Sequence, residues 1–157
     1  TGVEWETEAA RAAEFGLRVA SLRIGIVLGT EGGALEAMLL PFKLGAGGPL
    51  GSGKQWWSWI HVDDLVRMFL TAIDEGWTGA WNATAPEPER QARFAKALGR
   101  ALGRPAILPA PAFALRLLLG QQADLLLNGQ RAVPNALRAT GFHFQFSTPP
   151  GLTIFTA

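Results

Sequence analysis

The chain has 157 residues, of which 48% are hydrophobic and 17% charged, and its formal net charge is +1. This length suits one domain, or part of a domain with a small appendage, and so small a charge argues against nucleic acid as a partner. The absence of cysteine excludes disulfides, thiolate metal sites and a cysteine nucleophile.

The first predicted elements form an αβ unit. Apolar residues at helical spacing predict an amphipathic helix over residues 3–15, which Gly16 ends. Residues 19–28 are almost continuously apolar and rich in β-branched side chains, which is typical of a parallel strand covered on both faces. A helix that ends just before such a strand indicates the α/β class.

A glycine-rich segment then separates a short helix from a second αβ unit. The helix is predicted over residues 34–42, where Pro41 should weaken or end it, and residues 44–53 must form a loop. A strand is expected over residues 55–62. Asp63 or Asp64 should cap the next helix, which would run to about residue 74. Its inward face is predicted to carry Leu65, Phe69 and Ile73.

The remaining elements are short, and a change of composition divides them. The predictions are a strand at 81–84, a helix at 90–102, a strand at 107–108, helices at 112–119, 123–127 and 134–139, and a strand at 142–146. The composition becomes Leu-rich after Gly103. The sequence therefore predicts α/β sheet over residues 1–102 and a small helical lobe over residues 103–157.

Several blocks of sequence carry a resemblance to a known family. They are Trp5-Glu6, the run 23–29, the run 38–45, the loop 47–53, the run 59–65, the run 82–86, and Gly129-Gln130-Arg131 with Pro134. In this order they resemble an atypical branch of the extended short-chain dehydrogenases/reductases, the nucleotide-sugar-epimerase-like proteins often labelled cell-division-inhibitor homologues. The resemblance covers residues 5–146, and the part after Gly103 resembles that family's small C-terminal domain of unknown function.

The resemblance implies a fold and a cofactor. The fold would be the C-terminal part of a Rossmann-like, doubly wound parallel sheet, followed by the small lobe. In the family, an N-terminal half holds the NADP pyrophosphate on a glycine-rich turn, and no such turn follows a strand here. By resemblance, Arg23, Gly25, Ile26 and Val27 would lie against the nicotinamide side of the cofactor.

The same resemblance implies a substrate pocket, whose residues would be Met38, Trp57, Trp59 and His61. The chain has no tyrosine, so the tyrosine acid/base of most short-chain dehydrogenases cannot come from it. Many sugar-nucleotide epimerases hold the substrate phosphate with an asparagine where this chain has Ile26, which argues against a sugar-nucleotide substrate. No metal site is expected, and the catalytic residues stay unassigned.

Simpler interpretations compete with some of these roles. Arg23 either lies near the ligand or is a buried structural residue paired with a carboxylate, plausibly of the missing half. His61 either moves a proton or is a hydrogen-bonded structural histidine. Strand alternation places Trp57 and Trp59 on one face and Trp56 on the other, and either face can be core.

Other features have equally open interpretations. The loop 45–53 is a phosphate cradle, a substrate lid or a plain connection. The pair Asp63-Asp64 is better explained by helix capping than by catalysis. The basic helix face either binds nucleic acid or is solvated; its residues are Arg90, Arg93, Lys96, Arg100 and Arg104. Residues 113–127 either bind a membrane surface or partner or cover the lobe, and residues 147–157 depart from the family.

These observations predict the substrate-side portion of an NADP-dependent epimerase or oxidoreductase that is inactive alone, because the dinucleotide phosphate site is missing. The alternative is a non-catalytic binding protein that retains the fold. A genomic fragment that folds only with help from a neighbour is a third possibility. The expected partners are an unidentified small-molecule substrate and a missing N-terminal half or oligomeric partner, with neither nucleic acid nor membrane. No signal peptide or membrane span is visible, so a cytoplasmic location is expected.

Overall fold

The computed structural model describes residues 2–29 and 33–148. Its α-helices are α1 (Gly2–Arg11), α2 (Gly33–Lys43), α3 (Val62–Asp74), α4 (Gln91–Ala101), α5 (Ala112–Leu119), α6 (Ala123–Leu127) and α7 (Asn135–Ala139). Short 3₁₀ turns follow α1 (η1, Ala12–Phe15) and α5 (η2, Gly120–Gln122). The strands are β1 (Ala20–Ile24), β2 (Ile26–Leu28), β3 (Trp56–Trp57), β4 (Trp59–His61), β5 (Gly79–Ala83) and β6 (Glu89–Arg90).

The sheet is built from parallel pairs, which confirms the predicted α/β class. β1 pairs with β5, so that Ala20 lies opposite Gly79 and Ile24 opposite Ala83. β2 pairs with β4 in the same sense, and the short β3 and β6 pair antiparallel. The predicted strand over residues 19–28 is therefore present but is divided at Gly25, where it exchanges one partner strand for another.

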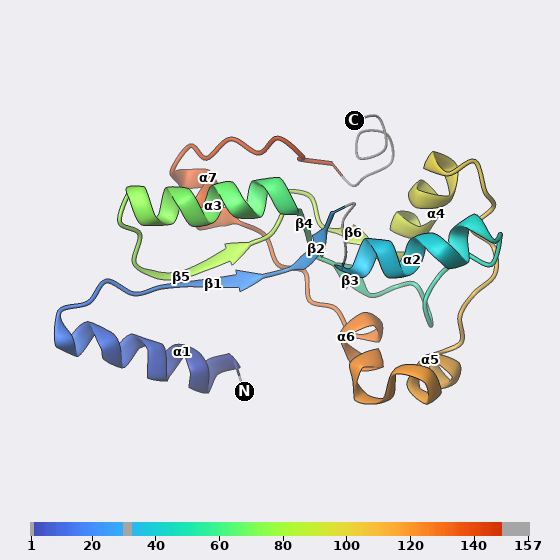
Figure 1. Ribbon diagram of the computed structural model, residues 1–157, viewed down its shortest axis with the longest axis horizontal. Coiled ribbons are helices and arrows are strands. Elements are labelled where there is room, and N and C mark those ends of the chain that lie inside the picture. The colour runs from blue at the N-terminus through green and yellow to red at the C-terminus, as the bar shows by residue number, and fades with distance from the viewer. Residues whose placement is uncertain (1, 30–32, 149–157) are drawn as a thin grey trace.

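Helices lie on both sides of the β1–β5 pair (Figure 1). α3 covers one face and α1 lies along the other, while α2, α4, α5 and α6 gather at the end toward which β1 and β5 point. The carboxyl ends of these strands thus face the part of the molecule built from the glycine-rich loop and the C-terminal lobe.

Two apolar clusters form the core. The first surrounds Trp57, Trp59 and Phe94, with the Trp57 and Phe94 rings 4.9 Å apart. The second lies between α3 and the sheet and contains Ile60, Met68, Trp77, Ala83 and Leu137, among others. The first cluster joins α2 and α4 to the strands, and Leu126 of α6 packs against it.

A buried carboxylate fastens the C-terminal segment to α3. The Asp64 side chain is fully buried and accepts hydrogen bonds from the backbone N–H groups of Gln145 and Phe146, both at 2.9 Å. The Arg67 guanidinium donates to the same carboxylate at 3.1 Å. Residues 142–146 form no strand among the described residues, although Phe142 and Phe144 pack on the second cluster and Phe146 on the first.

The structure corrects two predicted helix ends. His61, and not Asp63 or Asp64, caps α3, because its Nδ1 accepts a hydrogen bond from the Asp63 N–H. Pro41 does not end α2, which continues to Lys43. A proline in the last turn costs only one backbone hydrogen bond, so the helix continues past it.

Three predicted faces also differ. Phe69 and Ile73 of α3 are exposed, whereas Leu65 is buried as predicted, together with Asp64, Met68 and Ala72. No residue of α1 is buried, and the end of β1 is open, with Ile24 49% exposed. Ile107 and Leu108 are exposed and form no strand; the nearby parallel bridge joins Leu50 to Ala110. In contrast, α5 and α6 have the predicted bounds, and Gly16 ends the first helical segment with a φ of 75°.

We predict that Asp64→Ala lowers the free energy of unfolding by about 3 kcal/mol, because two buried backbone N–H groups lose their acceptor. Asp63→Ala is the matched control. The Asp63 side chain is 60% exposed, so its removal should lower the free energy of unfolding by about 1 kcal/mol or less. Urea unfolding followed by tryptophan fluorescence measures both. Equal losses in the two variants would contradict the proposed fastening role of Asp64.

Candidate functional site

The carboxyl ends of β1, β2, β4 and β5 define the edge at which open parallel sheets bind ligands. β1 ends at Ile24, β2 at Leu28, β4 at His61 and β5 at Ala83. The residues predicted to contact the cofactor, Arg23 and 25–27, therefore lie at this edge. Their contact with a nicotinamide stays a prediction.

Gly25 occupies the tightest point of this edge. Its N–H donates to the Ala83 carbonyl at 3.1 Å, and the next N–H, of Ile26, donates to the Ser58 carbonyl at 2.8 Å. A Cβ at Gly25 would lie 2.2 Å from the Ser58 carbonyl oxygen and 3.0 Å from Thr84 Cγ2. Only glycine lets the chain exchange β5 for β4 as its partner at this position, because any side chain would overlap the Ser58 carbonyl.

Arg23 points away from the core and forms an ion pair inside the chain. Its Nε and one terminal nitrogen each donate to a different oxygen of Glu6, both at 2.6 Å. The Arg23 side chain is 57% exposed, so the interpretation as a buried arginine is wrong, and its carboxylate partner comes from α1. The hydrogen bond and charge of Arg23 lower the pKa of Glu6. This bidentate pair is the polar tie between α1 and the sheet.

The four predicted pocket residues lie in different surroundings. Trp57 and Trp59 are at most 1% exposed and belong to the first core cluster, as their alternation on one face predicts. The Trp59 Nε1–H donates to the Glu87 carbonyl at 3.0 Å. Met38 of α2 is partly buried and lines a cavity described below.

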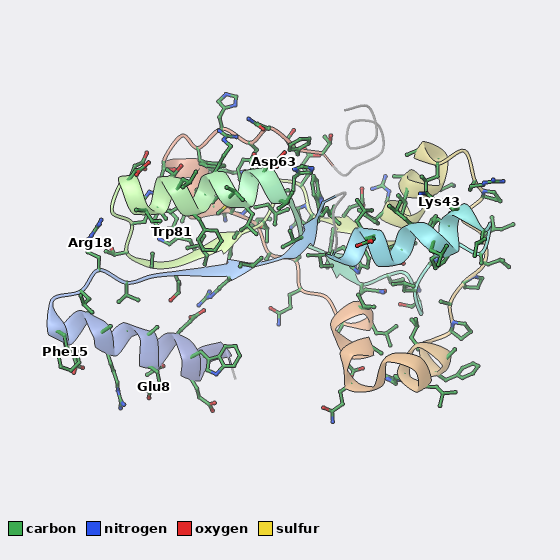
Figure 2. The ribbon with its side chains drawn as sticks, viewed as in Figure 1. Glu8, Phe15, Arg18, Lys43, Asp63 and Trp81 are labelled. Atoms are coloured by element: carbon green, nitrogen blue, oxygen red, sulfur yellow. The ribbon has the colours of Figure 1, made fainter. Side chains whose placement is uncertain are left out.

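His61 is buried at the start of α3, where Asp63 marks the first turn (Figure 2). Its ring stacks on Phe146 with 3.7 Å between centroids. Because Nδ1 accepts the Asp63 N–H at 3.2 Å, the neutral ring carries its proton on Nε2. Burial lowers the pKa of His61, against the opposing effect of the Asp63 and Asp64 carboxylates. These contacts favour the structural interpretation over proton transfer.

The glycine-rich loop 45–53 is fastened along its length. Gly47 and Pro49 carbonyls accept hydrogen bonds from the N–H groups of Leu108 and Ala110, and the Gly51 N–H donates to Ala110. A Cβ at Gly48 would lie 2.1 Å from the Leu108 carbonyl oxygen. These contacts make the loop a fixed wall against residues 108–110.

Sequence reasoning missed the side chains that join the lobe to the sheet. Ser58 Oγ donates to the Gln130 carbonyl at 2.8 Å and accepts from the Ala132 N–H at 2.9 Å. Trp56, on the other face of its strand, lies under the guanidinium groups of Arg90 and Arg131, at 3.8 and 5.2 Å from its ring centroid. Strand alternation did predict that Trp56 lies on the face opposite Trp57 and Trp59. Nothing in the neighbouring sequence indicates that Arg90 and Arg131 lie over its ring.

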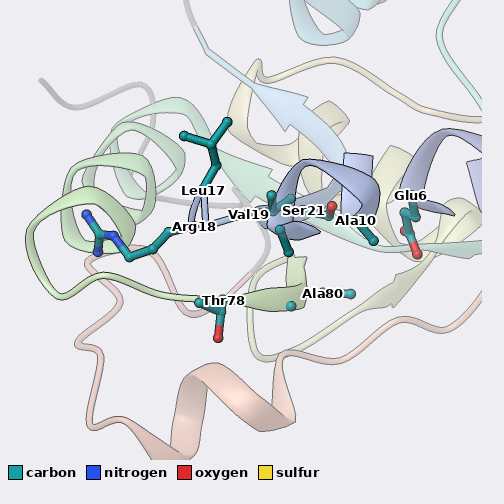
Figure 3. Close-up of a pocket in the computed structure, with 10 residues that line it drawn as sticks. Glu6, Ala10, Leu17, Arg18, Val19, Ser21, Thr78 and Ala80 are labelled. Atoms are coloured by element: carbon teal, nitrogen blue, oxygen red, sulfur yellow. The ribbon is translucent and has the colours of Figure 1, made fainter. Parts of the chain in front are cut away.

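A cavity of about 450 Å³ lies between α1 and the sheet (Figure 3). Its lining includes Leu17, Val19, Thr78 and Ala80, which belong to the amino-terminal parts of β1 and β5 or precede them. Parallel sheets bind ligands at their carboxyl ends, so this cavity is the space under a loosely packed helix and not the ligand edge.

Residues 2–29 and 33–148 meet the requirements neither of a metal site nor of a membrane-spanning helix. No group of three or more histidine and carboxylate side chains there is arranged to hold a metal ion. No helix in the same part of the chain is both long and apolar enough to cross a membrane.

Comparisons with family models give two matches. The NAD dependent epimerase/dehydratase family matches residues 2–83, which is more than half of the chain. A domain of unknown function (DUF1731) matches residues 110–150, which contain α5, α6 and α7.

Curated relatives and a solved structure extend these matches. The chain is 48% identical to the chloroplastic epimerase family protein SDR39U1 homolog of Arabidopsis thaliana, over 91% of this chain and 41% of the relative. It is 46% identical to an epimerase family protein of Staphylococcus aureus, over 92% and 48%. The crystal structure of human epimerase family protein SDR39U1 with NADPH superposes with a TM-score of 0.81 at 41% identity, over 85% and 46%. The chain thus spans about half the length of these relatives.

We predict that Gly25→Ala lowers the free energy of unfolding by about 3 kcal/mol or more, because its Cβ meets the Ser58 backbone. Gly29→Ala is the matched control on the same segment, since its Cβ would meet only the Val62 side chain, at 3.2 Å. That contact can relax, so the loss should stay below about 1 kcal/mol. Thermal unfolding followed by circular dichroism compares the variants, and a Gly25→Ala protein as stable as Gly29→Ala would contradict the steric argument.

A second prediction concerns pH. Because burial lowers the pKa of His61 in the folded state, the unfolded chain binds a proton first as the pH falls. Stability should be fully present above the ordinary histidine pKa of about 6.5 and should fall as the pH drops through the lower folded value. His61→Asn, which keeps a capping side chain, should reduce this dependence.

The control for this experiment is His143→Asn, because His143 is exposed. Melting temperatures measured between pH 8 and pH 5 should have the same pH dependence in this variant and in the unaltered chain. Loss of the pH dependence in His143→Asn, or its persistence in His61→Asn, would contradict the assignment to His61.

Proposed function

The chain belongs to the NAD-dependent epimerase/dehydratase family, and we propose that it forms the substrate-side half of an NADP-dependent epimerase or oxidoreductase. The observation that carries this proposal is the arrangement at Gly25, where the chain leaves one parallel strand pair and enters another beside the carboxyl ends of β1 and β5. The human relative solved with NADPH supports NADP as the cofactor.

The residues at this edge fit one part of the cofactor. Ile24 is half-exposed, Gly25 has no side chain, and Ile26 and Val27 are partly buried apolar residues. Ile26 packs on the first core cluster and Val27 on the second, so the uncharged backbone of this segment is the part that would meet the neutral ring of a reduced nicotinamide. The pyrophosphate finds no equivalent place, because the glycine-rich loop 45–53 follows a helix and is fastened to residues 108–110.

The β1 strand indicates where the other half of the site belongs. Among the described residues, β5 is the one strand that pairs with β1, so the opposite edge of β1 offers free backbone groups. Exposed apolar side chains of α3, Phe69 and Ile73, line a cavity beside Ala20 and Leu22 of β1. We therefore place a dinucleotide-binding half at this edge, adding a parallel strand to β1 and packing on α3.

When bound, the cofactor supplies the hydride. The residues of this chain would position the ring: the 24–27 backbone forms the wall, and the Arg23–Glu6 pair fixes α1 beside it. His61 takes no part in proton transfer, because its Nδ1 is engaged and its ring is stacked on Phe146. The acid/base group therefore belongs to the other half or to the substrate.

The proposal is tested by NADPH titration, followed by nicotinamide fluorescence. The isolated chain should show no saturable binding up to millimolar cofactor, because it lacks the phosphate site. Co-expression with the N-terminal half of the Staphylococcus aureus relative should restore micromolar binding. Ile73→Asp should weaken that restored binding by tenfold or more, about 1.4 kcal/mol, because it places a charge in the apolar contact.

The matched control is Leu117→Asp, which alters an 85% exposed leucine on α5, a helix of the C-terminal lobe. It should leave the restored binding unchanged. The proposal would be refuted if the chain alone bound NADPH at micromolar concentration, or if the co-expressed halves did not bind NADPH. Restored binding without turnover of any carbonyl or sugar substrate would favour a non-catalytic binding protein instead.

A further inference from the structure

Another cavity, of about 290 Å³, lies where α2 and the adjoining glycine-rich loop meet residues 108–126, which come much later in the sequence. α2 contributes one wall, the glycine-rich loop another, and the C-terminal lobe with the segment before it a third; Figure 1 shows these segments at one end of the molecule. The lining residues are Met38, Pro41, Phe42, Ala46, Gly47, Gly48, Leu50, Leu108, Ala110, Leu115 and Leu126. Every one is apolar or glycine.

Hydrogen bonds join the segments that form the walls of this cavity and fix them relative to one another. The loop is bonded to the Leu108 and Ala110 backbone, as described above. Gln55 Nε2 donates to the carbonyls of both Leu50 and Leu126, at 3.0 Å each, and so joins the loop to α6. The fully buried Gln91 accepts the Leu50 N–H at 2.9 Å. Closing the cavity would require breaking several of these bonds.

A cavity of this kind favours a ligand over a packing gap. The apolar, partly open cavity leaves its lining atoms without dispersion partners, which a bound apolar ligand would supply. The volume is close to the lower limit of small-molecule sites, about 300 Å³. The lining carries no charge, so an ionised ligand would lose its hydration without gaining a partner.

We propose that this cavity binds an uncharged apolar small molecule of up to three aromatic rings, or an alkyl chain of similar size. Ala110, Leu115 and Leu126 lie in the region that matches the domain of unknown function, so this region would serve to close an apolar binding site. The helices that line the cavity lie beyond the carboxyl ends of β1 and β5 (Figure 1), on the side where parallel sheets bind ligands. Binding in this cavity does not require the cofactor.

The test uses the two methionines of the chain as reporters. Met38 lines the cavity, whereas Met68 is fully buried in the second core cluster and serves as the internal control. The chain is labelled with ¹³C at the methionine methyl groups and titrated with N-phenyl-1-naphthylamine, an uncharged aromatic probe, without cofactor. The Met38 signal should shift saturably, because an aromatic ring next to a methyl group changes its shielding, while the Met68 signal stays in place.

A pair of variants on α5 localises the effect. Leu115→Trp fills the cavity and should abolish the Met38 shift, whereas Leu117→Trp adds the same bulk at a position 85% exposed and should preserve it. The sulfonated analogue 8-anilino-1-naphthalenesulfonate should bind about tenfold more weakly, because its charge finds no partner in the lining. Circular dichroism confirms that both variants are folded.

Three results would overturn the inference: an unmoved Met38 signal, equal shifts of both methionines, or a Met38 shift that persists in Leu115→Trp. Equal binding of the charged and uncharged probes would refute the assigned ligand class. Because no cofactor is present, each of these results is independent of the NADPH titration.

Discussion

The contact between Gly25 and the Ser58 backbone is the constraint on which the rest of the structure depends. It lets one continuous run of chain hydrogen-bond first to β5 and then to β4. Ser58 in turn bonds through its side chain to Gln130 and Ala132, so the same short segment carries the C-terminal lobe. A single Cβ at Gly25 would therefore disturb both the junction of the two strand pairs and the segment that holds the C-terminal lobe.

Local signals in the sequence were sufficient where the neighbours of a residue lie close along the chain. Gly16 and Gly120 mark the ends of helices because their positive φ is a property of the backbone itself. The cap of α3 was assigned wrongly because Asp64 has distant partners: the Gln145 and Phe146 N–H groups lie about eighty residues away and are invisible in the local pattern. Because the Asp64 carboxylate binds these N–H groups, His61 caps α3 instead.

Periodicity identifies an apolar face but does not say what covers it. Phe69 and Ile73 were predicted to face inward, and the described chain leaves them exposed beside β1, whose outer edge pairs with no described strand. Alternation correctly placed Trp57 and Trp59 together, yet core and pocket give the same pattern, and the structure buries both with Phe94. The apolar cavity uses leucines from α5 and α6 instead, which nothing in the local sequence connects to the glycine-rich loop.

The two proposed sites differ in how ligand binding relates to assembly with the dinucleotide-binding half. If the cofactor binds only when a dinucleotide-binding half is added at β1, then cofactor must strengthen that association by the same free energy, since the two equilibria are linked. At a cofactor concentration a hundred times its Kd, this amounts to about 2.7 kcal/mol. The apolar cavity lies between α2, the glycine-rich loop and the C-terminal lobe, all within this chain, and so carries no such coupling. One ligand would thus report on assembly, whereas the other would bind the lobe in either state.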